Sequence, residues 1–217
     1  MADISAKMVK ELRDRTGSGI MDSKKALVAT DGDMDAAVDW LRENGILKAE
    51  KKAGRVAAEG MIESYIHGDG KVGVLVEVNT ETDFAAQNTS FREFVHEVAL
   101  QIAAMSPKWV SREEVPEDIV ENEKSIYEAE AKNAGKPDKI IDNIVKGKLE
   151  KFYSVNCLLE QEYIRDDSKT IKDMLVAMIA EIGENIVIRR FTRYELGEGI
   201  EVEEEDFAAE VEKELNK

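Results

Sequence analysis

Val72-Gly73-Val74-Leu75-Val76-Glu77-Val78-Asn79 is the stretch of sequence that decides the fold. Valine occupies every second position, which indicates a β-strand with one buried face, and β-branched residues suit the pleated surface of a sheet. Gly68-Asp69-Gly70 lies just before it and is typical of a tight turn. We therefore expect Ile62 to His67 and Lys71 to Asn79 to pair as an antiparallel hairpin.

The strand is followed by Thr80-Glu81-Thr82-Asp83-Phe84, which we expect to be a polar loop ending in a large aromatic. An aromatic side chain on a loop has no assured place in the core, and it can anchor another molecule. It can also fold back into its own domain, as large apolar side chains commonly do. The loop residues leave both interpretations of Phe84 open.

The composition is that of a helical, globular and acidic protein. The chain has 217 residues, enough for one or two domains, with 43% hydrophobic residues and three prolines. Its net charge of −16 argues against direct binding to nucleic acid, because phosphate contacts need a basic surface. The same charge suits a protein partner that presents basic surface.

Cysteine usage and hydropathy point to the cytoplasm. Cys157 is the single cysteine, which excludes an intramolecular disulfide and fits a reducing compartment. The start of the chain is charged, and no apolar run approaches the roughly 18 residues of a membrane helix. The sequence therefore predicts a cytoplasmic protein with no signal peptide and no membrane contact.

The order of helix, strand and turn signals predicts an α+β fold in five parts. They are an N-terminal module of three short helices (1–45), a basic helical connector (46–59), an α/β core in which helices pack on an antiparallel sheet (60–112 and 155–197), a projecting helical hairpin (113–154) and a C-terminal helical module (198–217). The three-helix module resembles the ubiquitin-associated (UBA) fold.

Capping signals predict where individual helices begin and end. The third N-terminal helix is expected to end at Gly45, because glycine commonly follows the last turn of a helix. Ser90 with Glu93, and Ser111 with Glu114, have the spacing of capping boxes that open the next helices.

No constellation for catalysis is recognisable in the sequence. His67 and His96 lack cysteines or paired acids at metal-ligand spacing, and Cys157 lacks a recognisable base. The glycine-rich loops of nucleotide-binding folds and the nucleophile elbow of hydrolases are missing as well. We expect a protein that acts by binding, with no catalytic residue, metal, cofactor or small-molecule substrate.

Four segments, in the right order, are similar to translation elongation factor Ts. Two resemble its signature stretches: Glu11-Leu12-Arg13-Asp14-Arg15-Thr16-Gly17-Ser18-Gly19-Ile20-Met21-Asp22-Ser23-Lys24-Lys25-Ala26-Leu27 and Val76-Glu77-Val78-Asn79-Thr80-Glu81-Thr82-Asp83-Phe84. The others are Lys51-Lys52-Ala53-Gly54-Arg55 and Gly183-Glu184-Asn185-Ile186-Val187-Ile188-Arg189-Arg190. The resemblance covers nearly the whole chain, which has the pattern of a short member with a single core half.

The resemblance implies a guanine-nucleotide exchange factor rather than an enzyme. Such a factor binds elongation factor Tu in its GDP form, disturbs the magnesium site and promotes GDP release, so that GTP can bind during translation elongation. In this family an Asp-Phe pair lies near the nucleotide and the phenylalanine inserts between helices of the GTPase. The magnesium-displacing segment would then be Thr82, Asp83, Phe84 and Ala85.

The resemblance also implies further contacts and an assembly. Partner contacts beyond Asp83 and Phe84 are implied at Arg13, Ile20 and Met21 of the N-terminal module, at Ile164, and at Phe207 in the acidic terminal helix. Arg165 departs from the apolar pattern expected beside Ile164. Short members are implied to work as homodimers. The alternatives from other classes are an adaptor whose UBA-like module binds peptides and an enzyme whose site no motif reveals.

Overall fold

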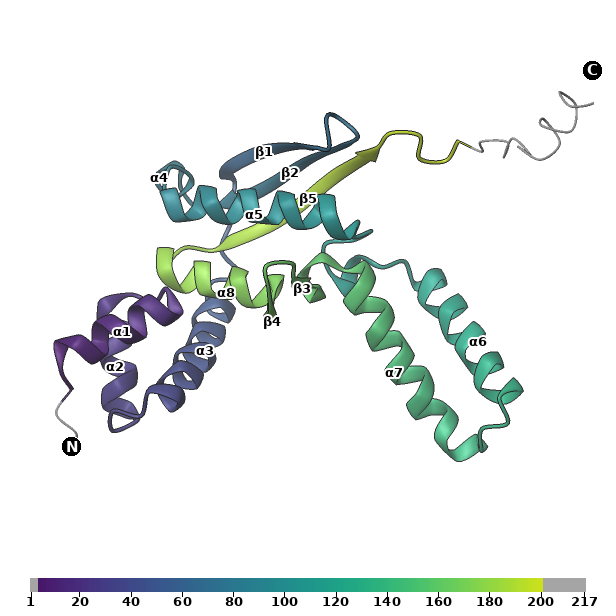
Figure 1. The fold of residues 1–217 in the computed structure, drawn as a ribbon, viewed down its shortest axis with the longest axis horizontal. Helices are drawn as coiled ribbons and strands as arrows, with labels where there is room; N and C mark the ends of the chain where they lie inside the picture. Colours follow the sequence, from purple (N-terminus) through teal and green to yellow (C-terminus); the bar gives the residue numbers. More distant parts are fainter. Residues whose placement is uncertain (1–3, 201–217) are drawn as a thin grey trace, which may run out of the picture.

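The valine strand is the central strand of a three-stranded antiparallel sheet in the computed structural model, which describes residues 4–200 (Figure 1). The sheet has the order β1-β2-β5, with β1 at Glu59–His67, β2 at Val72–Thr80 and β5 at Ile186–Glu195. The predicted hairpin of β1 and β2 is confirmed, and Glu59 pairs with Thr80 at its open end. On the other side of β2, Thr80 pairs with Ile186, so the end of β2 lies beside the start of β5.

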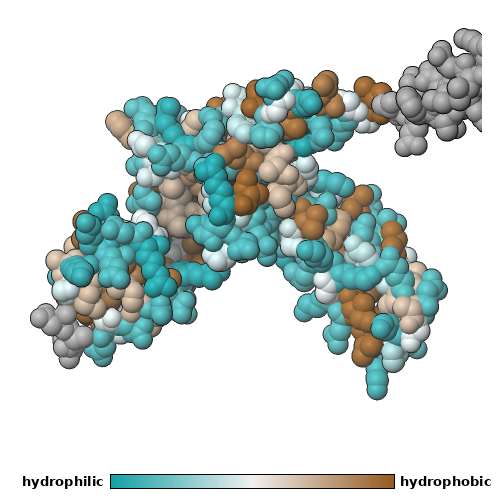
Figure 2. Space-filling view, in the orientation of Figure 1, coloured by the Kyte–Doolittle hydropathy of each residue, from teal (hydrophilic) through white to brown (hydrophobic). Residues whose placement is uncertain are grey.

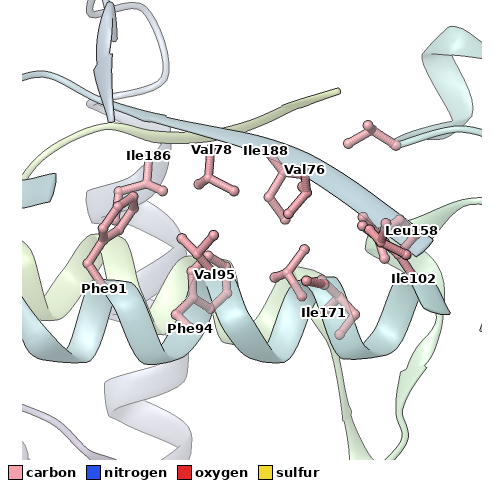
Figure 3. Packing of buried hydrophobic residues seen from close by; sticks show 14 of the residues in the cluster. Val76, Val78, Phe91, Phe94, Val95, Ile102, Leu158, Ile171, Ile186 and Ile188 are labelled. Carbon is pink, nitrogen blue, oxygen red and sulfur yellow. The ribbon is translucent and has the colours of Figure 1, made fainter. Parts of the chain in front are cut away.

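The main core lies between one face of this sheet and two helices, α5 (Thr89–Met105) and α8 (Ile171–Ile182). Val74, Val76 and Val78 are at most 2% exposed, whereas Leu75 between them is 52% exposed, as the period of two predicts. Figure 3 shows the inward side chains of the strands meeting those of the helices. The labelled members of this core are Val76, Val78, Phe91, Phe94, Val95, Ile102, Leu158, Ile171, Ile186 and Ile188.

The N-terminal module has three helices and a small core of its own. The helices are α1 (Ala6–Thr16), α2 (Ile20–Ala29) and α3 (Met34–Glu50). Ser5 caps α1 by accepting a hydrogen bond from the backbone N–H of Met8, and Gly17 ends it with a φ of 69°. The core of the module consists of Val9, Leu12, Ala26, Leu27 and Ala37. Its likeness to the UBA fold stays a prediction.

The prediction that the third helix ends at Gly45 is wrong. Helix α3 continues through Gly45 to Glu50, and residues 51–58 form turns and irregular backbone instead of the expected helical connector. Gly45 faces α8, and an added Cβ would lie 3.4 Å from a methyl carbon of Val176, which is ordinary van der Waals contact. Packing of α3 against α8 around this position therefore outweighs the weak helix propensity of glycine.

The helical hairpin consists of α6 (Glu117–Asn133) and α7 (Asp138–Asn156), and it projects from the core (Figure 1). The two helices bury Ala131, Ile141, Val145 and Leu149 between them. Figure 2 shows the hairpin and the three-helix module as two arms on opposite sides of the core. These features confirm the predicted α+β fold class.

Two predicted capping boxes are wrong. Asn88 caps α5 two residues before Ser90, because its side chain accepts a hydrogen bond from the Ser90 backbone N–H at 2.8 Å. Ser111 precedes a short 3-10 turn, η1 (Arg112–Glu114), and makes no side-chain cap. The Glu114 carboxylate instead accepts a hydrogen bond from the backbone N–H of Val110. In both places another polar side chain satisfies the backbone.

The structure adds small elements that the sequence did not predict. They are α4 (Asp83–Ala86), the 3-10 turn η2 (Leu158–Glu160) and a two-stranded sheet of β3 (Glu162–Tyr163) and β4 (Asp166–Thr170). The predicted C-terminal helix, which carries Phe207, lies outside the described residues. Among residues 4–200, none of the helices is long and apolar enough to cross a membrane.

Candidate partner-binding site

The segment after β2 is a single helical turn, not the polar loop expected from the sequence. Thr82 has an extended backbone, and its hydroxyl accepts a hydrogen bond from the Ala85 backbone N–H at 3.3 Å, so Thr82 caps α4. Ala85 and Ala86 are buried, and they hold one side of the turn against the core. The polar residues that suggested a loop act here as a helix cap.

Phe84 lies on the opposite side of this turn and is 81% exposed. Asp83 beside it is exposed as well. Within the described residues nothing covers the ring, so the interpretation that Phe84 folds back into its own core is wrong. A large aromatic presented in this way on an ordered turn is suited to fill a pocket on another protein.

Glu184, 102 positions after Thr82 in the sequence, holds the turn in place. Its carboxylate accepts hydrogen bonds from the Thr82 backbone N–H at 3.0 Å and from the Thr82 hydroxyl at 2.7 Å. Glu184 follows Gly183, which ends α8 with a φ of 84°, a backbone conformation that favours glycine. The end of α8 therefore fixes where this carboxylate meets α4.

Glu81 makes the reciprocal contact. Its carboxylate accepts a hydrogen bond from the Asn185 backbone N–H at 2.6 Å, while Arg55 approaches it at 3.4 Å. The Asn185 side chain in turn donates to the Arg55 carbonyl at 2.8 Å. We call Glu81, Thr82, Glu184 and Asn185 the carboxylate clamp.

Lys52 adds positive charge beside this clamp. Burial lowers the pKa of Lys52, the nearby cations Arg55 and Lys48 lower it further, and the carboxylates of Glu81 and Glu184 oppose the shift. Lys48, Lys52 and Arg55 thus form a local cluster of cations beside the carboxylates of Glu81 and Glu184.

The strand that leads to the site is fixed by a close approach between β1 and β2. Gly60 has a φ of 132°, and a Cβ at this position would lie 2.2 Å from the Val78 carbonyl oxygen. The next residue of β2, Asn79, donates its side-chain amide to the Glu59 carbonyl at 3.0 Å. Only glycine allows this approach, which sets the end of β2 and hence the start of the turn.

The predicted contact residues of the N-terminal module are on its surface. Ile20 is 59% and Met21 is 66% exposed at the start of α2, and Arg13 is exposed on α1. Helices α1, α2 and α4 lie at the same end of the molecule in Figure 1, opposite the hairpin. The module joins the core through packing of α3 against α8, and an ion pair of 3.0 Å between Arg42 and Asp173 lies there beside an open cleft of about 840 Å³.

Ile164 lies elsewhere, in the turn between β3 and β4, and is 42% exposed. Its backbone N–H donates to the buried Gln101 side chain at 3.0 Å. Glu97 accepts a hydrogen bond from the Tyr163 hydroxyl and pairs with Arg165 at 3.1 Å. Burial, and then the hydrogen bond to Glu97, raise the pKa of Tyr163 to about 12. Arg165 is thus held by an acid of its own chain.

The structure joins three of the four family-like segments around Phe84. Lys51 to Arg55, the end of β2 and Gly183 to Asn185 meet at the carboxylate clamp. The sequence contained these segments but no signal that Glu81 and Glu184 touch the turn, because partners in the clamp are 102 and 104 positions apart. Among residues 4–200, no group of three or more His, Cys, Asp or Glu side chains is arranged to hold a metal ion.

Comparisons with known proteins agree on one family. The family model described as Elongation factor TS matches residues 29–177. The chain is 56% identical over 217 residues to Elongation factor Ts of Desulfitobacterium hafniense, covering 100% of both chains. It is 62% identical over 198 residues to Elongation factor Ts of Caldanaerobacter subterraneus subsp. tengcongensis, covering 91% of this chain and 99% of the relative.

Proposed function

The chain belongs to the elongation factor Ts family, and on this premise we propose that it is the guanine-nucleotide exchange factor of elongation factor Tu. It binds the GDP form of that GTPase during translation elongation in the cytoplasm, promotes release of GDP and leaves the site open to GTP. It acts by binding, without forming or breaking a covalent bond in its partner.

The observation that carries this proposal is the exposed Phe84 on a turn held by the carboxylate clamp. We propose that the ring inserts between helices of the GTPase near the nucleotide. Thr82, Asp83, Phe84 and Ala85 then form the segment that disturbs the magnesium site. An ordered turn suits this task, because little conformational entropy is left to lose on binding.

Disturbing magnesium is sufficient to weaken GDP binding. The ion bridges phosphate oxygens and neutralises their charge, so the loss of its ligands leaves the phosphates poorly compensated. The coupling is reciprocal, because a factor that weakens GDP binding is itself bound more weakly by the GDP form, and by the same ratio. The complex therefore forms and dissociates as nucleotide leaves and binds.

Other surfaces of the chain complete the proposed contact. Arg13, Ile20 and Met21 would bind the GTPase domain, and the exposure of all three is compatible with that role. Ile164 and Phe207 are proposed as additional contacts on the same partner. At Ile164 the contact would include a charged rim, since Arg165 lies beside it.

Release of a fluorescent GDP analogue from elongation factor Tu tests this function. Substoichiometric amounts of the protein should accelerate release many-fold, because each molecule can act on successive partners. The matched controls are the protein without the GTPase and the Phe84→Ala variant. If release is unchanged by the protein at saturating concentration, the exchange function is refuted and the adaptor alternative gains support.

We also propose that the chain works as a homodimer through the outer face of its sheet. Both α5 and α8 lie on the other face in Figure 1, and Ile62, Ile66 and Leu75 are each more than half exposed on the outer one. Glu77 on this face is paired with Arg189 at 2.8 Å, so two copies of a strongly acidic chain can meet here without carboxylates repelling each other.

Sedimentation equilibrium tests the dimer. The chain should sediment as a dimer at micromolar concentration, and Leu75→Asp should give a monomer, because it would bury a charge at the centre of the interface. Ile126→Asp is the matched control, since Ile126 is 42% exposed on the hairpin and away from the sheet. A monomeric parent chain would refute the dimer.

A further inference from the structure

The carboxylate clamp joins the segment at Glu81-Thr82 to the segment at Glu184-Asn185 through reciprocal hydrogen bonds from backbone to carboxylate. Glu81, just before the turn, accepts from the backbone of Asn185, and Glu184, just before Asn185, accepts from the backbone of Thr82. Each segment thus supplies one carboxylate and one backbone N–H to the other. Hydrogen bonds to a charged acceptor are roughly twice as strong as those between neutral groups.

The contact of Glu184 with the Thr82 hydroxyl also determines what that hydroxyl can do. A hydroxyl has a single proton, and here the proton is directed to Glu184 at 2.7 Å. A lone pair of the same oxygen is then free to face the Ala85 backbone N–H, which it accepts at 3.3 Å. Glu184 therefore orients the group that caps α4.

The turn has few other sources of order. Helix α4 has only four residues, and a single helical turn is unstable by itself in water. Its largest side chain, Phe84, is 81% exposed and contributes little packing. The Thr80 hydroxyl adds a hydrogen bond to the Thr82 carbonyl at 2.8 Å. The orientation of Phe84 thus rests on the two buried alanines, on this bond and on the clamp.

We propose that Glu184 and Glu81 are positioning residues for nucleotide exchange, which hold α4 so that Phe84 points outward before the partner arrives. This inference rests on the proposed exchange function. It assigns a role to the Gly183-Glu184-Asn185 segment, which does not itself present an aromatic or apolar anchor to the partner. Glu184 has the larger role, because it serves both the backbone and the cap of the turn.

Glu184 and Glu81 differ in how many of their hydrogen bonds a glutamine at the same position could keep. At position 184 both carboxylate oxygens accept from Thr82, so Glu184→Gln places an NH₂ group against a donor or reverses the hydroxyl. At position 81 a single oxygen makes the 2.6 Å bond, and the contact with Arg55 is long at 3.4 Å. Glu81→Gln can keep the short bond. We therefore expect a roughly tenfold slower catalysed GDP release for Glu184→Gln, the order of one lost charged hydrogen bond, and less than threefold for Glu81→Gln.

The test combines GDP release with a cycle of variants. Glu184→Gln and Thr82→Val should both slow release, because each removes the contact between the Thr82 hydroxyl and the Glu184 carboxylate. In a Phe84→Ala background Glu184→Gln should have no further effect, because its action passes through Phe84. Glu150→Gln is the matched control, because it also removes one carboxylate charge and the contacts that this carboxylate makes, here an ion pair with Arg112, but lies on the hairpin.

A measurement without the partner separates this inference from the exchange function. Amide hydrogen exchange of the free chain should show faster exchange at Thr82 and Ala85 in Glu184→Gln, with the core strands unchanged. Unchanged exchange at these amides, or a loss of activity that simply adds to that of Phe84→Ala, would overturn the positioning role. If the parent chain does not accelerate GDP release from elongation factor Tu, the exchange function is refuted. The amide measurement would still decide whether Glu184 orders the turn.

Discussion

Phe84 and Phe91 form a natural pair for separating function from stability. They are seven positions apart in the sequence, yet Phe84 is 81% exposed and Phe91 is fully buried at 0%. Burying a whole phenylalanine side chain contributes about 1.5–3 kcal/mol, so the covered fifth of Phe84 contributes about 0.3–0.6 kcal/mol. Phe84→Ala should lower the free energy of unfolding by no more than this. Phe91→Ala, which leaves a cavity in the core, should lower it by about 3–5 kcal/mol.

The expected effect of Phe84→Ala on exchange follows from the exposed part of the same side chain. If the partner buries the remaining four fifths, the lost binding free energy is about 1.2–2.4 kcal/mol. At 1.4 kcal/mol per factor of ten, this corresponds to a loss of about 7- to 50-fold in the efficiency of GDP release. Phe84→Leu, which keeps an apolar side chain, should lose less.

Two assays on the same preparations decide the matter. Chemical denaturation followed by circular dichroism gives the free energy of unfolding, and stopped-flow release of a fluorescent GDP analogue gives the exchange efficiency. A Phe84→Ala variant that loses about 3 kcal/mol of stability would refute the exposed position of the ring. A variant that exchanges within twofold of the parent chain would refute the role of Phe84 as an anchor.

Three further predictions concern stability and reactivity. Burial raises the pKa of the Cys157 thiol to about 11, so the native chain should resist alkylation at pH 8 and react after unfolding, as a thiol-reactive dye can measure. Hydrogen bonds from Arg189 and Arg190 lower the pKa of Glu77 to about 2, below its ordinary 4.5, so the stabilising effect of Glu77 is present above pH 4.5 and is lost as the pH falls toward 2. Thermal unfolding of Glu77→Gln should therefore depend less on pH across this window than that of the parent chain. Gly60→Ala should destabilise the fold by about 3 kcal/mol or more, because the added Cβ would meet the Val78 carbonyl at 2.2 Å. Gly54→Ala, with open space around it, should be within about 0.5 kcal/mol of the parent chain by the same denaturation assay.

The parts of the fold that were predictable are those fixed by local pattern. The period of two in Val72 to Val78 sets which side of β2 is buried, and Gly68-Asp69-Gly70 sets the register with β1. Both signals lie within a few residues of the structure they determine. The same holds for the hairpin of α6 and α7, whose turn carries Gly135 and Pro137.

The wrong predictions arise where a distant contact outweighs a local preference. Gly45 has the sequence signature of a helix end, but α3 continues through it and packs there against α8. The turn at Thr82 looks like a loop because its residues are polar, but the Thr82 hydroxyl caps a helical turn and is itself oriented by the carboxylate of Glu184. No local pattern encodes a partner 102 positions away.

The polar character of the clamp explains how a large aromatic can stay exposed on an ordered turn. A turn as short as α4 is unstable by itself in water, and burying Phe84 to hold it would leave no exposed ring to insert into a partner. Here Ala85 and Ala86 supply the packing, and the carboxylates of Glu81 and Glu184 supply directional bonds to the backbone. The apolar surface of Phe84 is thus not buried in the core of its own chain and remains available for binding. In the proposed exchange cycle, the binding free energy of about 1.2–2.4 kcal/mol worked out above for Phe84 is given up when nucleotide returns and the factor dissociates.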